Sequence, residues 1–243
     1  MKNWYEYDIS KGILAAKYFH EGEDFEGFLN RVSGIFSNEI QSKVKEAMKD
    51  GKFFPAGRVL HGAGADKDGF RATPMNCYTM PNPQDNLESI FDTCKEMART
   101  FSMGGGAGVN ISNLRPKGAK VRNSAISSTG AVSFLNVINA TGETIGAQGR
   151  RAAIMVGLDC THPDLEEFLH IKETNHKLSS MNISILFTDA FFDAVKNNKP
   201  WKLHFEVKAT GEKIERTINA REFFHRFCKV NYDYGDPKHI WGL

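Results

Sequence analysis

A single cysteine, Cys77, stands in the stretch MNCYTM (residues 75–80), close to prolines on both sides. A thiol can act as a nucleophile, bind a metal or carry electrons through a disulfide, whereas many free cysteines are inert, buried packing residues. The prolines and the neighbouring Asn76 do not fit a helix that would simply bury a small side chain. Cys77 is therefore a candidate for redox chemistry, with inert packing as the competing interpretation.

Two loops combine glycines and cations in a way that is typical of phosphate binding. They are the glycine-rich stretch 104–122 and GAQGRR, residues 146–151, and their arginines are Arg115, Arg122, Arg150 and Arg151. Glycine lets backbone N–H groups approach a phosphate closely, and guanidinium forks match its oxygens. A dinucleotide-binding fold is excluded, because its glycines follow a strand and open a helix. Here a helix precedes the glycines and a strand follows them, and no P-loop motif occurs.

The remaining titratable groups fit structural roles. Asp85 and Glu88 resemble a capping box ahead of an apolar helix. Cys94 lies on the apolar stripe of that helix, and Cys228 borders a later one, so packing explains both. The helix macrodipole explains the carboxylates that open the helix after His162, without any metal site: Asp164, Glu166 and Glu167.

Composition describes an ordinary globular chain. Its 243 residues are 41% hydrophobic and 25% charged, with a net charge of +2 and no charged block, which gives no reason to expect nucleic-acid or membrane partners. No apolar run is long enough for a transmembrane helix, and the N-terminus lacks the apolar core of a signal peptide. The four cysteines form no C-x-x-C pair, which argues against structural zinc. A reducing cytoplasm is the expected location.

Helical and strand patterns alternate along the chain and position these candidates. Helical patterns are expected over 25–35, 85–101, 131–145, 162–172, 189–198 and 221–230. Strands are expected around 109–111, 152–158 and 181–187, a hairpin over 201–218, and a long loop over 53–74. This alternation predicts an α/β domain with a largely parallel sheet.

Several stretches, in order, resemble the large catalytic subunit of ribonucleotide reductase. They are FPAGRVLHGAG (54–64), NCYTM (76–80), DNLESI (85–90), GGGAGVNISNLRPKGAKV (104–121), STGAVSFLNV (128–137), GRRAAIMVGLDCTHPDLEEFL (149–169) and MNISILFTDAFFDAV (181–195). The resemblance covers most of residues 11–237. It implies the first half of a ten-stranded α/β barrel over residues 51–243, preceded by a small helical segment over residues 1–50.

The resemblance also implies roles for individual residues. Cys77 matches a cysteine beside the substrate ribose, which delivers reducing equivalents and ends the cycle in a disulfide with a cysteine far along the chain. A dithiol suits that reduction because closing a disulfide supplies two electrons. Substrate-binding positions are Asn76, Gly106, Arg58, Arg150 and Arg151. Positions that hold a deoxynucleoside triphosphate effector are Asp85, Arg115, Val121 and Arg122.

Cofactors and partners follow from the same resemblance. The similarity is greatest to the adenosylcobalamin-dependent group, whose cobalamin contacts lie largely outside this chain. Expected partners are a thioredoxin-like or other dithiol reductant and a second copy of the chain, joined through the effector-site helices.

One departure from the family opens two functional alternatives. The family's radical cysteine, in an N-x-C-x-E pattern, does not occur, and the chain ends at GDPKHIWGL, where relatives continue into the next barrel strand. The chain is therefore expected to need a second polypeptide for the rest of the barrel and to lack reductase activity alone. The alternative is a non-catalytic remnant that at most binds a nucleotide.

Overall fold

The computed structural model describes residues 2–65, 73–121, 126–145, 152–176, 178 and 181–241. The chain forms two compact units, Met1–Asn76 and Cys77–Leu243. The sequence places the start of the barrel after residue 50, whereas the described residues between 51 and 76 group with the preceding helices. The reason is a short helix in that stretch, α4 (Gly57–Gly62), whose Leu60 is buried in the core of the helical unit.

The helical unit contains η1 (Trp4–Glu6), α1 (Asp8–Lys17), α2 (Phe25–Ser33), α3 (Asn38–Lys49) and α4. Its core joins Leu14, Phe28, Leu29, Val32, Met48, Leu60 and Ala63. Two sequence expectations are wrong here. Part of the expected loop over 53–74 is the helix α4. The apolar face of α2 also ends at Val32, because the helix stops at Ser33 and Ile35 is exposed.

Arg31 explains why α4 belongs to this unit. Its guanidinium pairs with Glu23, with Nε 2.7 Å from Oε1. Its Nη1 donates to the carbonyl oxygens of Leu60 at 3.1 Å and Ala63 at 2.7 Å. One nearly buried side chain thus satisfies carbonyl groups at the end of α4 and ties them to α2.

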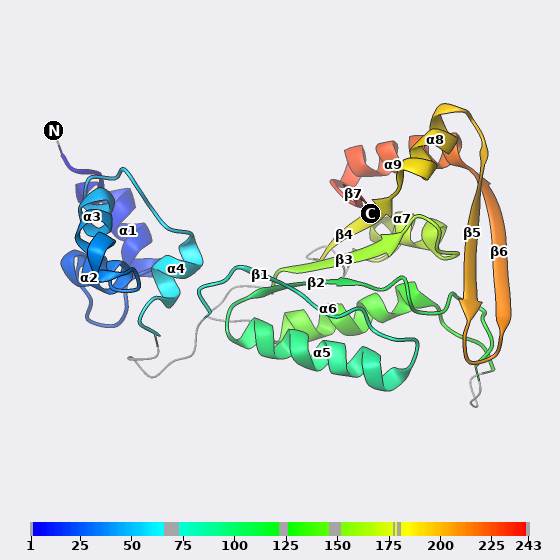
Figure 1. Cartoon of the computed structure of the whole chain (residues 1–243), viewed down its shortest axis with the longest axis horizontal. Coiled ribbons are helices and arrows are strands. Elements are labelled where there is room, and N and C mark those ends of the chain that lie inside the picture. The colour runs from blue at the N-terminus through cyan, green and yellow to red at the C-terminus, as the bar shows by residue number, and fades with distance from the viewer. Residues whose placement is uncertain are drawn as a thin grey trace. The chain divides into compact units, whose positions relative to one another are not determined.

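The second unit is built on a five-stranded parallel sheet (Figure 1). Its strands are β1 (Cys77–Thr79), β2 (Gly106–Asn110), β3 (Ile154–Asp159), β4 (Met181–Phe187) and β7 (Lys238–Trp241). Neighbours in the sheet follow chain order, β1-β2-β3-β4-β7, and every pair is parallel. β3 and β4 are almost continuously buried, as expected for strands covered on both faces.

Helices connect successive strands, as sequence alternation predicts. They are α5 (Leu87–Ser102), η3 (Ala131–Phe134) with α6 (Leu135–Thr144), α7 (Leu165–Thr174), α8 (Asp189–Lys196) and α9 (Ala220–Tyr234). In Figure 1, α5 and α6 lie along one side of the sheet, and α7, α8 and α9 lie by β4 and β7. Within the described residues β1 and β7 each have one strand neighbour, so the barrel is not closed. The α/β class and the partial barrel are confirmed.

The hairpin expected over 201–218 is present as β5 (Pro200–Val207) and β6 (Glu212–Asn219), paired antiparallel apart from the main sheet. It is tied to the segment after β3. The amide of His204 donates to the Thr161 carbonyl at 2.7 Å, and Trp201 Nε1 donates to the Cys160 carbonyl at 2.8 Å. Thr188 and Asn219 cap α8 and α9, since each side chain accepts an amide N–H of the helix that follows.

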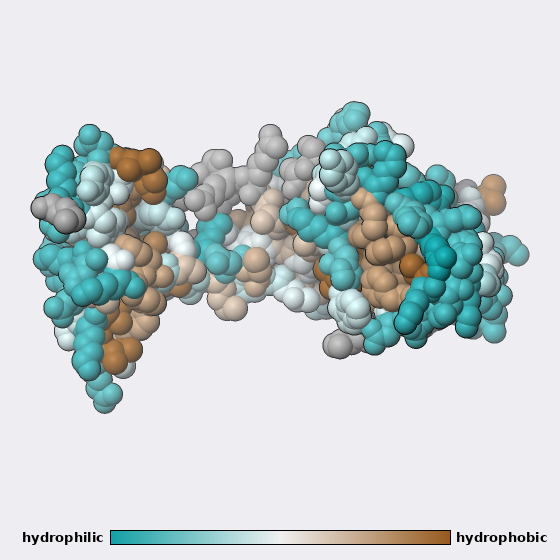
Figure 2. All heavy atoms as spheres, turned by 90° about the horizontal axis from the view of Figure 1, so that it is seen from above, coloured by the Kyte–Doolittle hydropathy of each residue, from teal (hydrophilic) through white to brown (hydrophobic). Residues whose placement is uncertain are grey.

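β7 corrects a sequence expectation. The stretch PKHIWGL was read as lying before the next barrel strand, yet Lys238–Trp241 pair in parallel with β4 as that strand. All four residues of β7 are exposed, with Trp241 at 56%. Brown, hydrophobic atoms reach the surface in both units (Figure 2). On β7, Ile240 and Trp241 leave two large apolar side chains exposed on the last described strand of the sheet.

Candidate active and nucleotide-binding sites

Cys77 begins β1, and its thiol is exposed. In the sheet register it lies directly beside Gly106, the first residue of β2. Asn76, also exposed, precedes it at the end of the helical unit. The structure therefore brings together Cys77 and Gly106, two residues that the sequence assigned to one site. Inert packing does not describe an exposed thiol at the first residue of an edge strand.

The glycines before β2 have a packing role that the sequence did not reveal. A Cβ on Gly105 would lie 2.8 Å from the ring of Tyr78 and 2.8 Å from the methyl group of Thr100. The absence of a side chain at Gly105 therefore leaves room for the ring of Tyr78, the residue that follows Cys77 in β1. At least part of the glycine run is explained by the packing of β1 against α5, without any phosphate.

Asp85 and Arg115 form an ion pair within the predicted effector site. Arg115 Nε donates to Asp85 Oδ2 at 2.8 Å, and the Arg115 amide donates to Asp85 Oδ1 at 3.0 Å. Arg115 Nη2 also reaches the Asp85 carbonyl at 3.3 Å, and Nη1 the Lys120 carbonyl at 2.8 Å. The two side chains are only 24% and 16% exposed. Both oxygens of the carboxylate are thus engaged by one arginine residue.

This geometry corrects the capping box predicted at Asp85 and Glu88. The N-cap of α5 is Asn86, whose side chain accepts the Ser89 amide at 2.8 Å. Asp85 instead holds a residue thirty positions later in the chain. Local sequence cannot separate neighbouring Asp and Asn residues as caps, because both side chains are good acceptors for helix amides.

The other predicted site residues are only partly covered by the described structure. Val121 is half-buried. Arg58 lies on α4 of the helical unit. Arg122, Arg150 and Arg151 lie outside the described residues.

A groove of about 680 Å³ adjoins the loop that carries Arg115. Its lining combines apolar side chains, such as Val132 and Ile171, with hydroxyl and charged groups, among them Lys117, Ser128 and Ser133. A second groove, of about 360 Å³, lies between α7 and α9 and is lined mainly by charged side chains such as His170, Arg226 and Asp233. The second groove suits a polar ligand, and the first suits a ligand that has both polar and apolar parts.

The other three cysteines divide by burial. Burial raises the pKa of the Cys94 thiol and raises that of Cys160 to about 11. Both thiols stay protonated at neutral pH, so packing is their role. Cys228, assigned to packing from sequence, is instead exposed on α9. Exposure alone therefore does not distinguish Cys77 as the candidate redox thiol. Its position beside Gly106 does.

Within the described residues, neither a metal-binding cluster nor a membrane-spanning helix is present. No group of three or more His, Cys, Asp or Glu side chains is arranged to hold a metal ion. No helix there combines the length and the apolar character that crossing a membrane requires.

Comparison with known proteins gives a consistent result. Residues 75–241 match the model of the ribonucleotide reductase barrel domain. A vitamin B12-dependent ribonucleoside-diphosphate reductase of Thermoplasma acidophilum is 32% identical over 239 residues, which cover 98% of this chain and 29% of the relative. A protein with the same name from Mycobacterium tuberculosis is 36% identical over 188 residues, covering 76% and 26%. The chain thus spans less than a third of the length of these relatives.

Proposed function

The chain belongs to the ribonucleotide reductase family, and we propose that it supplies the reducing thiol and the effector-binding part of a working reductase. The observation that carries this proposal is the exposed Cys77 thiol, in register with Gly106 at the start of two neighbouring strands. A substrate lying across these two strands would meet a thiol from one and the side-chain-free backbone of the other.

The proposed chemistry is a two-electron reduction. Cys77 and a second cysteine from outside residues 1–243 are oxidised to a disulfide, releasing two protons and two electrons. The ribose 2′-carbon loses its hydroxyl as water and gains hydrogen. A dithiol reductant of the thioredoxin type then restores both thiols. Substrate contacts are assigned to Asn76, Gly106, Arg58, Arg150 and Arg151, and the relatives' names favour a ribonucleoside diphosphate as substrate.

The effector proposal rests on the Asp85–Arg115 pair. Nη1 and Nη2 of Arg115 each donate to one carbonyl in the structure, and each carries a second N–H. We assign those donors, with Arg122, to the phosphates of a deoxynucleoside triphosphate. Asp85 and Val121 would lie by its sugar and base. The ion pair with Asp85 holds the guanidinium in place before the nucleotide arrives.

A second copy of the chain is a proposed partner through the helices next to this site. Leu87 and Phe91 lie one turn apart on α5 and are 56% and 53% exposed. Large apolar side chains four residues apart on an exposed helix face are suited to helix–helix contact.

The remaining barrel strands are proposed to come from polypeptide outside residues 1–243, supplied by a second chain. The exposed edge of β7 supports this proposal. Adenosylcobalamin is proposed only at the level of the class, on the strength of the relatives' names. It would supply the radical, and no residue here is assigned to it. A cytoplasmic location is part of the same proposal.

The decisive experiment compares two exposed cysteines. Cys77→Ser in the assembled enzyme is expected to abolish repeated turnover with a dithiol reductant, whereas Cys228→Ser is expected to leave it unchanged. Deoxynucleotide formation over many turnovers is the measurement. Undiminished turnover in Cys77→Ser would remove the proposed role of this thiol. Reductase activity of the 243-residue chain alone would show that no second polypeptide is needed.

A further inference from the structure

Two buried polar side chains at the start of α7 have no place in the proposed chemistry. His162 is 2% exposed and Asp164 is 3% exposed. Burying a carboxylate is costly unless hydrogen bonds satisfy its oxygens. The hydrogen-bond partners of these two side chains therefore show how burial is compensated and which segments the side chains connect.

The Asp164 carboxylate joins two segments far from it in sequence. Its Oδ1 accepts the Lys117 amide at 3.0 Å, and its Oδ2 accepts the Ala131 amide at 3.0 Å. Lys117 belongs to the segment 114–121, here called the Arg115 loop, and Ala131 begins η3. One carboxylate thus fixes the Arg115 loop to the helix that leads into α6.

Asp164 does not serve the helix that it precedes. It occupies the N-cap position of α7, yet its side chain makes no capping hydrogen bond there. An aspartate at this position usually accepts an amide of its own helix. Here the side chain is directed to the Arg115 loop instead, so the explanation from helix capping and the macrodipole is incomplete.

Gly130 shows how closely the segments approach. Its φ is +93°, and a Cβ there would lie 2.8 Å from Asp164 Oδ2 and 2.9 Å from Lys117 Cβ. Only glycine combines this backbone conformation with room for the carboxylate. Gly130, the glycine of the stretch STGAVSF, is thereby needed for the close approach of Asp164 to Lys117.

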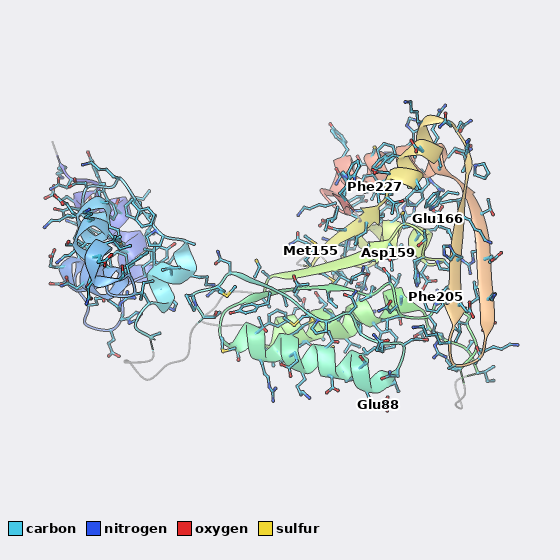
Figure 3. All side chains as sticks on the ribbon, in the orientation of Figure 1. Glu88, Met155, Asp159, Glu166, Phe205 and Phe227 are labelled. Carbon is cyan, nitrogen blue, oxygen red and sulfur yellow. The ribbon has the colours of Figure 1, made fainter. Side chains whose placement is uncertain are left out.

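His162 holds the other side of the Arg115 loop. Its Nδ1 accepts the Asp164 amide at 3.0 Å, so Nε2 carries the proton and donates to the Leu114 carbonyl at 2.8 Å. Leu114 directly precedes Arg115. The ring of Phe205, on β5, packs against the imidazole at 5.6 Å between centroids. Figure 3 shows Phe205 on the hairpin and Asp159 on the sheet.

We propose that His162 and Asp164 are positioning residues that hold the Arg115 loop in the form that binds the nucleotide effector. The proposal rests on the effector site proposed above. If the loop left this arrangement, the buried carboxylate would lose the Lys117 amide and keep only the Ala131 amide of η3. That penalty keeps the loop in one conformation, so that effector binding does not have to order it.

The test uses the assembled reductase, with each of the four deoxynucleoside triphosphates titrated separately in a calorimeter. Asp164→Ala is expected to weaken effector binding at least about tenfold, because the charge-assisted bonds that join the Lys117 amide of the loop to the Ala131 amide of η3 through one carboxylate are lost. Asp164→Asn retains one acceptor oxygen and is expected to fall between Asp164→Ala and the wild type. Amide exchange at Lys117 and Ala131 should accelerate in both variants.

Glu167→Gln is the matched control. Glu167 lies on the same helix and contacts the exposed Lys117 side chain at 3.3 Å, without touching the backbone of the loop. Its replacement is expected to change effector affinity less than about twofold, as for other exposed ion pairs.

The outcomes separate this inference from the site on which it rests. If the wild type binds an effector, Arg115→Ala loses it and Asp164→Ala binds as the wild type does, the positioning role is overturned and the effector site stands. If Asp164→Ala lowers only the unfolding temperature, with effector affinity intact, Asp164 is structural alone. If the wild type binds none of the four nucleotides, both proposals fall.

Discussion

Two regions are proposed to serve the same reaction but are built differently. One is the start of β1 and β2, with Cys77 and Gly106, here called the Cys77 strand edge. The other is the Arg115 loop. At the strand edge the reactive group is exposed, and its position comes from backbone register between β1 and β2. At the Arg115 loop the polar groups are largely buried. Asp85 pairs with Arg115, and Asp164 and His162 form hydrogen bonds with the backbone of the loop. A redox thiol must be accessible to a reductant, whereas a binding loop benefits from being fixed in advance.

The largest effect expected from this contrast is in thiol reactivity. At pH 7.5, a maleimide should label Cys77 and Cys228 rapidly in the folded chain, and Cys160 more slowly by about two orders of magnitude or more, because the thiolate is the nucleophile. The raised pKa of Cys160, about 11, reduces its thiolate fraction, and burial blocks access. Mass spectrometry of labelled peptides over time gives the four rates. Rapid labelling of Cys160 in the folded state would contradict the division into exposed and buried thiols.

The second effect concerns the ion pair at the Arg115 loop. Asp85→Ala is expected to lower the free energy of unfolding of the sheet unit by about 2 kcal/mol, because Arg115 would keep a partly buried, unpaired charge. Asp92→Ala is the matched control, since Asp92 lies on α5 and makes an exposed pair with Lys95. Its replacement should change stability by less than about 0.5 kcal/mol. If urea unfolding showed equal losses of stability for the two variants, the Asp85–Arg115 pair would contribute no more than an exposed ion pair.

The sequence located the strand edge better than it located the loop. Cys77 and Gly106 stand out by residue type, and parallel pairing of consecutive strands brings them together. Asp85, by contrast, looked like a helix cap, and Asp164 like a carboxylate placed for a helix dipole. Both side chains make their contacts thirty or more residues away, and short-range pattern rules carry no information at that separation.

The same limit applies to the fold. Short continuous apolar runs predicted β3 and β4, and a pattern of period 3.6 predicted α5, because burial there is set by local sequence. The helix α4 was missed because Gly57 and Gly62 lower its intrinsic propensity, and it forms by burying Leu60 and engaging Arg31. Strand β7 was missed because four exposed residues show no alternation, and only pairing with β4 defines it.

A third effect tests the packing that supports Cys77. Gly105→Ala is expected to destabilise the sheet unit by about 1–3 kcal/mol, because the new methyl group would meet the Tyr78 ring and Thr100 at 2.8 Å. Gly108→Ala, also in this stretch, is the control, since its Cβ would have only ordinary contacts at 3.9 Å. Urea unfolding measures both variants. If the Gly105 variant were as stable as the control, the glycine would be free for another role, such as close approach of a ligand.

The last expected effect is a pH dependence at the buried end of the loop, which is absent at neutral pH. Burial lowers the pKa of His162, although Asp164, Asp159 and Asp85 attract the protonated form. On the hairpin, His204 and Arg216 flank the same segment. The neutral imidazole is the form that fits, because protonation of Nδ1 would place its N–H against the amide N–H of Asp164.

The sign of this pH dependence follows from the direction of the shift. In the unfolded chain His162 titrates near its ordinary pKa of about 6.5, so below that pH the unfolded state binds more protons than the folded state. The contribution of neutral His162 to the free energy of unfolding is therefore fully present above a pH of about 6.5. It declines as the pH falls toward the lower pKa of the folded state, by about 1.4 kcal/mol for each pH unit across that window.

Two variants isolate this contribution from other titrating groups. His162→Gln removes the ionisable ring, so the stability advantage of the wild type over this variant should shrink between pH 7 and pH 5. His225→Gln, at an exposed position on α9, is the control for loss of a histidine outside the buried site. Urea unfolding at a series of pH values measures both differences. An advantage over His162→Gln that grew as the pH fell would mean that His162 is held protonated, reversing the hydrogen-bond assignment at Nδ1.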